Sequence, residues 1–125
     1  MENTSGPTFA NGKICYLEIT ALDITISCSF YEAVFGWHIR NDNQGNANFD
    51  DTTGNVSGMW VTGRPASTEP GILVSIMVDD IVETLNLIKT NGGIAMPIEE
   101  ISEKERMARF SDPAGNVFSL YQYGH

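Results

Sequence analysis

Residues 110–122, FSDPAGNVFSLYQ, have the pattern of a strand, a tight turn and a second strand. Asp112-Pro113 is typical of the start of a turn, and Gly115-Asn116 tolerates the positive backbone angles that close one. After the turn, one set of alternating side chains is apolar and the other is mixed: Phe118 and Leu120 against Val117, Ser119 and Tyr121. The stretch predicts a strand with one buried face that ends a sheet, and it raises the question of what Ser119 does on the mixed face.

Towards the N-terminus the same order of elements occurs twice: one strand, one helix and three further strands. Asp23 and Asp80 stand at the expected N-caps of the two helices, and Gly36 and Gly92 stand where each helix should end. Helical spacing predicts that one face of the first helix is apolar: Ile26, Phe30, Ala33 and Val34. We therefore predict an α+β fold of paired βαβββ repeats, with cup-shaped mixed sheets and the helices outside. One face of each sheet then bounds a concave space or an interface.

A chain of 125 residues suits one domain with one core. We expect residues 1–12 to be a flexible N-terminal tail and residues 13–125 to be a single domain. Within it, repeat one covers about 13–63 and repeat two about 70–123.

The charge and hydropathy of the chain argue against nucleic-acid-binding and membrane proteins. The chain has 7 Lys and Arg against 16 Asp and Glu, a net charge of −9, which argues against a nucleic-acid partner. No apolar run approaches the length of a membrane span, and the first residues lack the basic and apolar parts of a signal peptide. We expect a cytoplasmic protein with no membrane partner, whose cysteines, Cys15 and Cys28, are free, mostly buried thiols.

Three segments resemble a known superfamily: FYEAVFGW (30–37), ILVSIMVDDI (72–81) and FSDPAGNVFSLYQ (110–122). In this order and spacing they are similar to the vicinal oxygen chelate superfamily of glyoxalases, bleomycin-resistance proteins and extradiol dioxygenases. Within it, the chain resembles the subgroup of predicted enzymes related to lactoylglutathione lyase. The resemblance implies a cup formed by the sheets, often completed by a homodimer. In metal-dependent members, four side chains from the first and last strands of each half hold one divalent ion that stabilises charge on the substrate.

The positions that the resemblance assigns to metal ligands are occupied here by poor donors. They are Tyr16 on the first strand, Leu73 seven residues before Asp80, and Ser119 on the last strand. The fourth ligand belongs to the strand around SGMWVTG, where no Asp, Glu or His occurs between residues 51 and 69. Divalent ions prefer imidazole, thiolate or carboxylate ligands. We therefore expect no metal ligands and no cofactor.

Glu18 is the carboxylate predicted on the mixed face of the first strand, together with Tyr16. If the cup excludes water, the pKa of Glu18 rises and the residue becomes a candidate general base. The alternative is that Glu18 is solvated or pairs with an arginine such as Arg109 or Arg64.

Other residues are candidates for the wall of an apolar binding pocket. Trp60 and Tyr121 provide aromatic surface, although Trp60 fits a core position equally well. Ser75 shares a face with Leu73 and could orient a ligand by a hydrogen bond. Arg109 indicates either an anionic ligand or a solvated surface position.

These observations favour a protein that binds an unknown small molecule in its cup as a homodimer, sequestering an apolar or aromatic compound without a metal. One alternative is a metal-independent lyase or isomerase that uses Glu18 as its base. The other is a metal-dependent enzyme of the lactoylglutathione lyase type.

Overall fold

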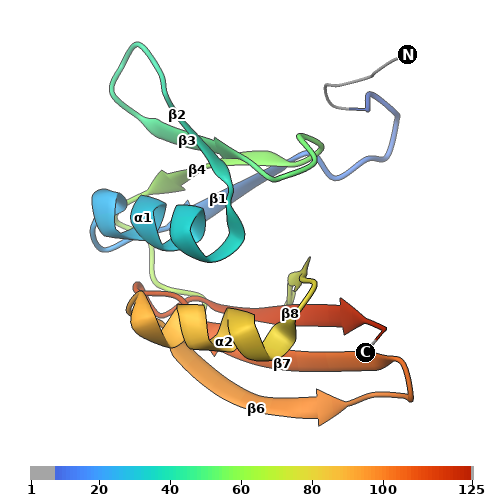
Figure 1. Cartoon of the computed structure of the whole chain (residues 1–125). Coiled ribbons are helices and arrows are strands. Elements are labelled where there is room, and N and C mark those ends of the chain that lie inside the picture. The colour runs from blue at the N-terminus through green and yellow to red at the C-terminus, as the bar shows by residue number, and fades with distance from the viewer. Residues whose placement is uncertain (1–7, 125) are drawn as a thin grey trace.

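The computed structural model describes residues 8–124, which fold into two similar βαβββ units (Figure 1). The first unit contains β1 (Tyr16–Thr20), α1 (Ile24–Phe35), β2 (His38–Asn41), β3 (Ala47–Asp50) and β4 (Ser57–Val61). The second contains β5 (Ser75–Met77), α2 (Ile81–Thr90), β6 (Ile94–Glu100), β7 (Glu105–Ser111) and β8 (Val117–Tyr123). This arrangement confirms the predicted α+β fold of paired repeats.

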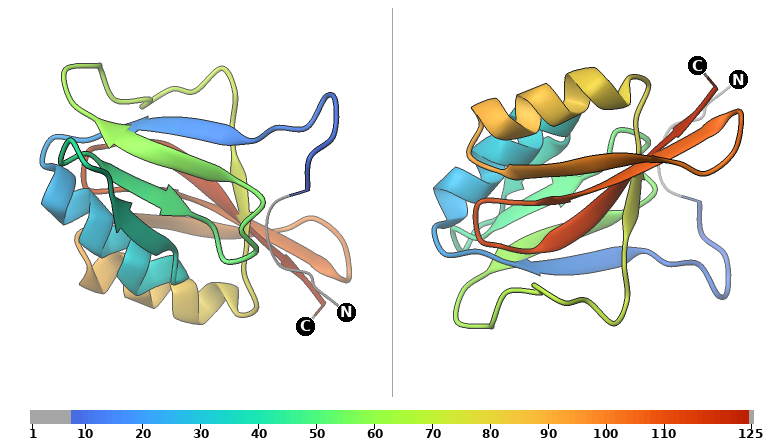
Figure 2. Two further views of the ribbon diagram at one scale, coloured as in Figure 1. Left: turned by 90° about the horizontal axis from the view of Figure 1, so that it is seen from above. Right: turned by 90° about the horizontal axis from the view of Figure 1, so that it is seen from below.

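Each unit contributes one mixed four-stranded sheet with the same order of strands. Sheet A has the order β1-β4-β3-β2 and sheet B the order β5-β8-β7-β6. The first strand of each unit is an edge strand that pairs in parallel with the last strand, and the other pairs are antiparallel. The connection from β4 to β5 runs from one sheet to the other (Figure 2).

The residues predicted to cap the helices do so. Asp23 Oδ1 accepts a hydrogen bond from the Ile26 amide at 3.2 Å, and Asp80 Oδ1 accepts one from the Glu83 amide at 3.0 Å. Gly36 ends α1 with a φ of 72°. The C-cap of α2 is Asn91, one residue before the predicted glycine.

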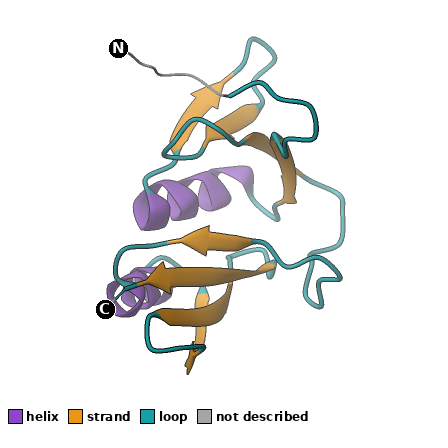
Figure 3. Cartoon of the chain, turned by 90° about the vertical axis from the view of Figure 1, so that its right-hand side faces the viewer, coloured by secondary structure: helices purple, strands orange, loops and turns teal. Residues whose placement is uncertain are grey.

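The placement of α1 differs from the prediction, because this helix lies between the two sheets and not outside them (Figure 3). Its buried face is rotated around the helix from the predicted stripe and contains Ser27, Phe30, Tyr31 and Val34. Ile26, predicted to face the core, is 54% exposed. A helix that is covered on two sides buries two adjacent rows of side chains, so the simple one-sided pattern misplaced Ile26.

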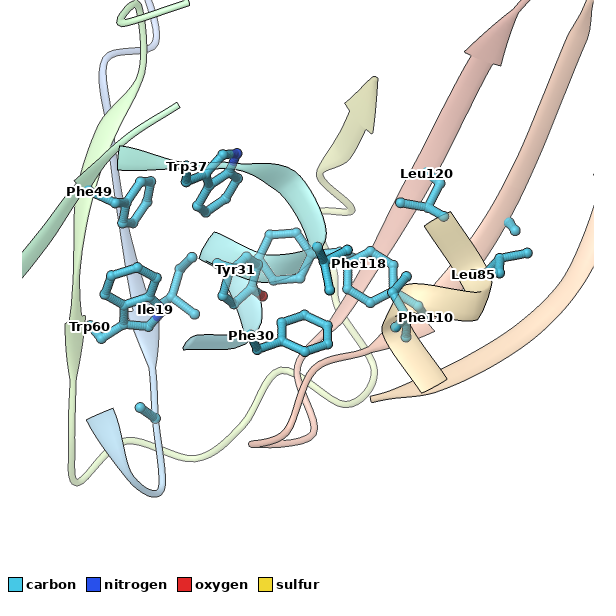
Figure 4. Close-up of a cluster of buried hydrophobic side chains, with 14 of the residues drawn as sticks. Ile19, Phe30, Tyr31, Trp37, Phe49, Trp60, Leu85, Phe110, Phe118 and Leu120 are labelled. Carbon is cyan, nitrogen blue, oxygen red and sulfur yellow. The ribbon is translucent and has the colours of Figure 1, made fainter. Parts of the chain in front are cut away.

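Aromatic rings on α1 join the two units into one hydrophobic core (Figure 4). Tyr31 stacks on Trp37 with ring centroids 4.8 Å apart, and Trp37 stacks on Phe49 of sheet A at 4.5 Å. On the other side, Tyr31 meets Phe118 of sheet B edge-on at 6.0 Å. The helix-covered faces of both sheets therefore share this core, and the other face of each sheet is turned away from it.

A buried hydrogen-bonded group, here called the junction cluster, consists of Tyr31, Asp112 and Asn116. Asp112 Oδ2 accepts hydrogen bonds from the Tyr31 hydroxyl at 2.8 Å and from Asn116 Nδ2 at 2.9 Å. Asn116 Nδ2 also donates to the Thr20 carbonyl at 2.9 Å, and Asn116 Oδ1 accepts from the Ser67 amide at 2.9 Å. The turn before β8 is thus hydrogen-bonded both to the first unit and to the segment that connects β4 with β5.

The junction cluster leads to a prediction about the ionisation of Tyr31. Burial raises the pKa of Tyr31 well above its usual value of 10, and the nearby negative charge of Asp112 and the hydrogen bond to it act in the same direction. In an absorbance titration we expect Tyr31 to stay neutral in the folded protein at a pH where an unfolded chain ionises all four tyrosines. The stabilisation that this shift supplies is present below the unfolded pKa, about 10, and is lost as the pH rises above it.

The matched variant for this titration is Tyr31→Phe. It should remove the ionisation step at the highest pH and leave the signal of the remaining tyrosines unchanged, including that of Tyr121, whose pKa is also raised. If the step at the highest pH persisted in Tyr31→Phe, its assignment to Tyr31 would be wrong.

Three further sequence expectations concern the N-terminal segment, membrane spans and the cysteines. Residues 1–7 of the predicted tail lie outside the described residues, and within the rest of it the Thr8 amide donates to Asn55 Oδ1 at 2.9 Å. No helix within residues 8–124 is long and apolar enough to cross a membrane. Cys15 is exposed and Cys28 half-buried, so the expectation of mostly buried thiols was wrong.

Candidate functional site

The faces turned away from the core, here called open face A and open face B after their sheets, carry most of the predicted site residues. Side chains of paired residues on neighbouring strands lie side by side on the same face. The pairing of β1 with β4 therefore puts Tyr16 and Glu18 on open face A beside Ser57 and Met59. The pairing of β5, β8 and β7 puts further predicted residues on open face B: Ser75, Arg109, Ser119 and Tyr121.

Glu18 forms an ion pair with Arg64, with Oε1 and Nη2 2.6 Å apart. The two side chains are 42% and 56% exposed, so water reaches both. They lie at a small pocket of about 200 Å³ between β1, the β4–β5 connection and β8. Of the two alternatives for Glu18, this geometry matches the arginine-paired carboxylate and lacks the desolvation that a general base would need.

Tyr16 takes part in a polar network on open face A that the sequence alone did not indicate. Its hydroxyl donates to Asn48 Oδ1 at 3.3 Å. Nearby, Arg40 binds Asp50 through two hydrogen bonds of 2.8 and 3.0 Å, and Ser57 Oγ donates to Asp50 at 2.6 Å. Hydrogen bonds from Arg40 and Ser57 lower the pKa of Asp50 from its usual value. This carboxylate is therefore already satisfied by its own neighbours.

Open face B has two adjacent rows of side chains that run across its strands. The polar row contains Ser75 on β5, Ser119 on β8 and Arg109 on β7. Ser119 is only 1% exposed, and its Oγ donates to the Leu120 carbonyl at 3.3 Å. Ser75 and Arg109 on either side of it are exposed.

The second row lies two residues away from the polar row on each of these strands and is mainly apolar. It contains Met77, Tyr121, Met107 and, at its end on β6, Glu99. Tyr121 donates its hydroxyl to Glu105 Oε1 at 2.7 Å, and this hydrogen bond raises the pKa of Tyr121. Because the hydroxyl is already engaged, Tyr121 offers mainly its ring to a ligand. Met77 is 74% exposed, so its side chain adds apolar surface to this sheet face.

Two predicted site residues lie elsewhere. Trp60 is 1% exposed on the helix-covered face of sheet A, so it is a core residue and not a wall of an open face. Its pairing with Ile19 could have indicated this, since Ile19 was already predicted on the apolar face of β1. Leu73 precedes β5, half-buried, two residues before Ser75.

The donor set at the positions that the resemblance assigns to metal ligands does not fit a divalent ion. Tyr16, Leu73 and Ser119 offer a phenol, an alkyl chain and a buried hydroxyl. The pairing of β1 with β4 settles the register of the fourth strand, whose open-face residues are Ser57, Met59 and Val61. None of these side chains is an imidazole, thiolate or carboxylate. Within the described part of the chain, no three His, Cys, Asp or Glu residues form a group that could hold a metal ion.

A larger groove of about 740 Å³ opens between the two units on the side of the helices. Trp37 and Phe49 from the first unit and Asp80 and Glu83 at the start of α2 contribute to its lining. No sequence pattern pointed to this groove, because its walls come from units that are far apart in the chain.

Comparison with known proteins agrees with this fold. The model of the Glyoxalase/Bleomycin resistance protein/Dioxygenase superfamily matches residues 13–120. A search of curated proteins found no match. Similar solved structures include the fosfomycin resistance protein FosX from Listeria monocytogenes, with a TM-score of 0.75 and 14% identity, covering 90% of this chain and 92% of that one.

Two further solved structures resemble the chain over nearly their whole length. One is a glyoxalase/bleomycin resistance protein/dioxygenase family enzyme from Burkholderia phytofirmans PsJN, with a TM-score of 0.71, 18% identity and coverage of 90% and 99%. The other is TnmS3, an antibiotic binding protein from Streptomyces sp. CB03234, with a TM-score of 0.68, 21% identity and coverage of 94% and 100%. At these identities the similarity extends to the fold alone.

Proposed function

Because the chain belongs to the Glyoxalase/Bleomycin resistance protein/Dioxygenase superfamily, we propose that it binds a small organic molecule on its open faces without using a metal ion. The observation that carries this proposal is the composition of open face B. It presents apolar and aromatic side chains beside a few polar ones, the usual composition of a small-molecule site. The ligand positions on both faces hold no set of metal donors.

The proposed ligand is an apolar or aromatic compound that the protein sequesters. TnmS3 is named as an antibiotic binding protein, and FosX is named for fosfomycin resistance, so the fold serves proteins of this kind. A lyase or isomerase based on Glu18 would first have to separate this carboxylate from Arg64 and exclude water from it. For this reason binding, and not catalysis, is the function we propose. The narrower placement in the subgroup related to lactoylglutathione lyase and a cytoplasmic location are part of the same proposal.

We further propose that two copies of the chain form a homodimer that completes the cup. β1 and β5 are edge strands with unpaired backbone groups along one side. Large apolar side chains on or beside these strands are exposed: Ile14 76%, Tyr16 46%, Ile72 85% and Met77 74%. Pairing β1 of one copy with β5 of another would cover these side chains and join an open face A to an open face B.

Native mass spectrometry of the full chain, purified without chelators, tests the proposal. We expect a homodimer that carries an organic mass and no stoichiometric metal. Ile72→Asp should shift the protein towards the monomer because it places a charge at the proposed contact. Leu22→Asp, at an apolar residue that is 81% exposed in the loop after β1, is the matched control and should remain dimeric.

Other results would contradict the metal-free site or the dimer contact. A stoichiometric divalent metal that co-purifies with the protein would contradict the metal-free site. A wild-type monomer, or equal effects of the two Asp substitutions, would contradict the proposed dimer contact.

A further inference from the structure

Arg109 differs from the other arginines of the chain in its charge environment. Arg40, Arg64 and Arg106 each form an ion pair with a carboxylate: Asp50, Glu18 and Glu100. The Arg109 guanidinium has no ion-pair or hydrogen-bond partner among residues 8–124, although acidic residues outnumber basic ones by 16 to 7 in the sequence. An exposed guanidinium on a sheet face retains all five of its N–H donors for another molecule.

The polar row places a second hydrogen-bonding side chain near this guanidinium. Ser119 lies between Arg109 and Ser75 and is only 1% exposed, so neighbouring side chains already cover it, whereas Arg109 and Ser75 are exposed. Strands are about 4.8 Å apart, so the outer two residues of the row are roughly 10 Å apart at the backbone. An arginine side chain is long enough to span most of this separation, so one group at the surface of the row could bind both Arg109 and Ser75.

The apolar row provides a surface for the rest of such a molecule. Met77, Tyr121 and Met107 lie beside the polar row, and the Tyr121 hydroxyl is engaged by Glu105. Glu99 ends this row on β6 beside Met107, and Arg109 is the one cationic side chain in the two rows. The charges therefore favour a negative group between Arg109 and Ser75, on the side away from Glu99, with the apolar part of the molecule on Met77 and Tyr121.

We propose that open face B binds an organic anion, an oxyanion head group on an apolar or aromatic body. The head group binds Arg109 and Ser75, and the body lies on Met77, Tyr121 and Met107. The planar fork of an arginine suits both carboxylate and phosphonate oxygens. This inference rests on the proposed small-molecule function and specifies the class of ligand.

The test uses the full-length chain and four simple probes: benzoate, phenylphosphonate, neutral benzamide and cationic benzylamine. Binding is measured by NMR titration at low and at moderate salt. We expect the two anions to bind more tightly than benzamide and benzylamine, and to lose affinity as salt is added. The stronger of the two anions identifies the type of head group.

Arg109→Gln and Arg106→Gln form a matched pair of variants. Both residues are on β7, but Arg106 is paired with Gln122 of β8, on the helix-covered face, and its charge is engaged by Glu100. Arg109→Gln should weaken benzoate binding by about 10- to 100-fold, the usual range for losing a hydrogen bond to a charged group, and leave benzamide binding unchanged. Arg106→Gln should have no effect on either probe.

The outcomes separate this inference from the function on which it rests. Benzamide or benzylamine binding as tightly as benzoate on open face B would overturn the anion preference and leave small-molecule binding intact. If Arg109→Gln shifted the dimer equilibrium and left benzoate binding unchanged, Arg109 would belong to a contact between copies and the inference would fail. Failure of all four probes on open face B would count against both proposals for this face.

Discussion

Asp112→Ala is expected to lower the free energy of unfolding by about 3–5 kcal/mol, because it removes the acceptor of four hydrogen bonds at one buried position. The Asp112 carboxylate accepts hydrogen bonds from the Tyr31 hydroxyl, from Asn116 Nδ2 and from the Ala114 and Asn116 amides. The site is 3% exposed, so water cannot replace the missing oxygen atoms without the two units opening.

Urea denaturation at fixed protein concentration measures this effect. Asp23→Ala is the control, since it removes another aspartate that accepts a helix amide but lies at the surface, and it should cost about 1 kcal/mol. Tyr31→Phe removes one bond of the cluster and should cost about 1–2 kcal/mol, so the test remains informative if Asp112→Ala does not fold. An effect of Asp112→Ala no larger than that of Asp23→Ala would contradict the structural role of the junction cluster.

Gly58→Ala is expected to destabilise the fold by about 3 kcal/mol, at the upper end of the usual range for overpacking. Gly58 lies on β4, in the middle of sheet A, where it pairs with Leu17 on β1 and Phe49 on β3. A Cβ atom at this position would overlap the Leu17 carbonyl oxygen and the Phe49 ring. Since the carbonyl belongs to the backbone of β1, the clash can be relieved only by displacing that strand or the ring.

Gly71→Ala is the matched control for this substitution. A Cβ at Gly71 would meet no atom within 4 Å, and the residue does not have a positive φ. We expect its effect on stability to stay within about 0.5 kcal/mol, as for most surface substitutions. Thermal and urea unfolding of the two variants should differ clearly, and similar stabilities would show that sheet A accommodates the added methyl group.

The helices could be predicted because their signals are local. Asp23 and Asp80 each accept a hydrogen bond from an amide three residues later. Gly36 and Gly92, which both have positive φ, lie at or just after the ends of the same helices. The repeated order of strands and helices can also be recognised from local sequence patterns alone. The position of α1 between the sheets could not be predicted in this way. The presence of Tyr31 beside Phe30 was the one indication that this helix has two buried sides.

Part of the candidate site could also be predicted, because the alternation of side chains along a strand is a local signal. Counting alternate residues along each strand assigned Ser75, Ser119 and Tyr121, and the strand pairing puts them on one face. The face of Arg109 was left open by the sequence and is decided by its pairing with Ser119. Trp60 could not be assigned this way, because apolar residues alternate on both faces of β4 and only its partner Ile19 decides the orientation. The bonds from Asn116 to Thr20 and Ser67 span 96 and 49 residues, and no local pattern indicates them.

The bond between Asn116 and Thr20 also has a consequence for the order of events during synthesis. Thr20 leaves the ribosome well before its partner Asn116, which is added 96 residues later. Until then the first βαβββ unit lacks both this bond and the aromatic side chains of sheet B that cover Tyr31. The first unit therefore lacks these contacts until β8 has been synthesised, which favours folding of the two units together and not one after the other.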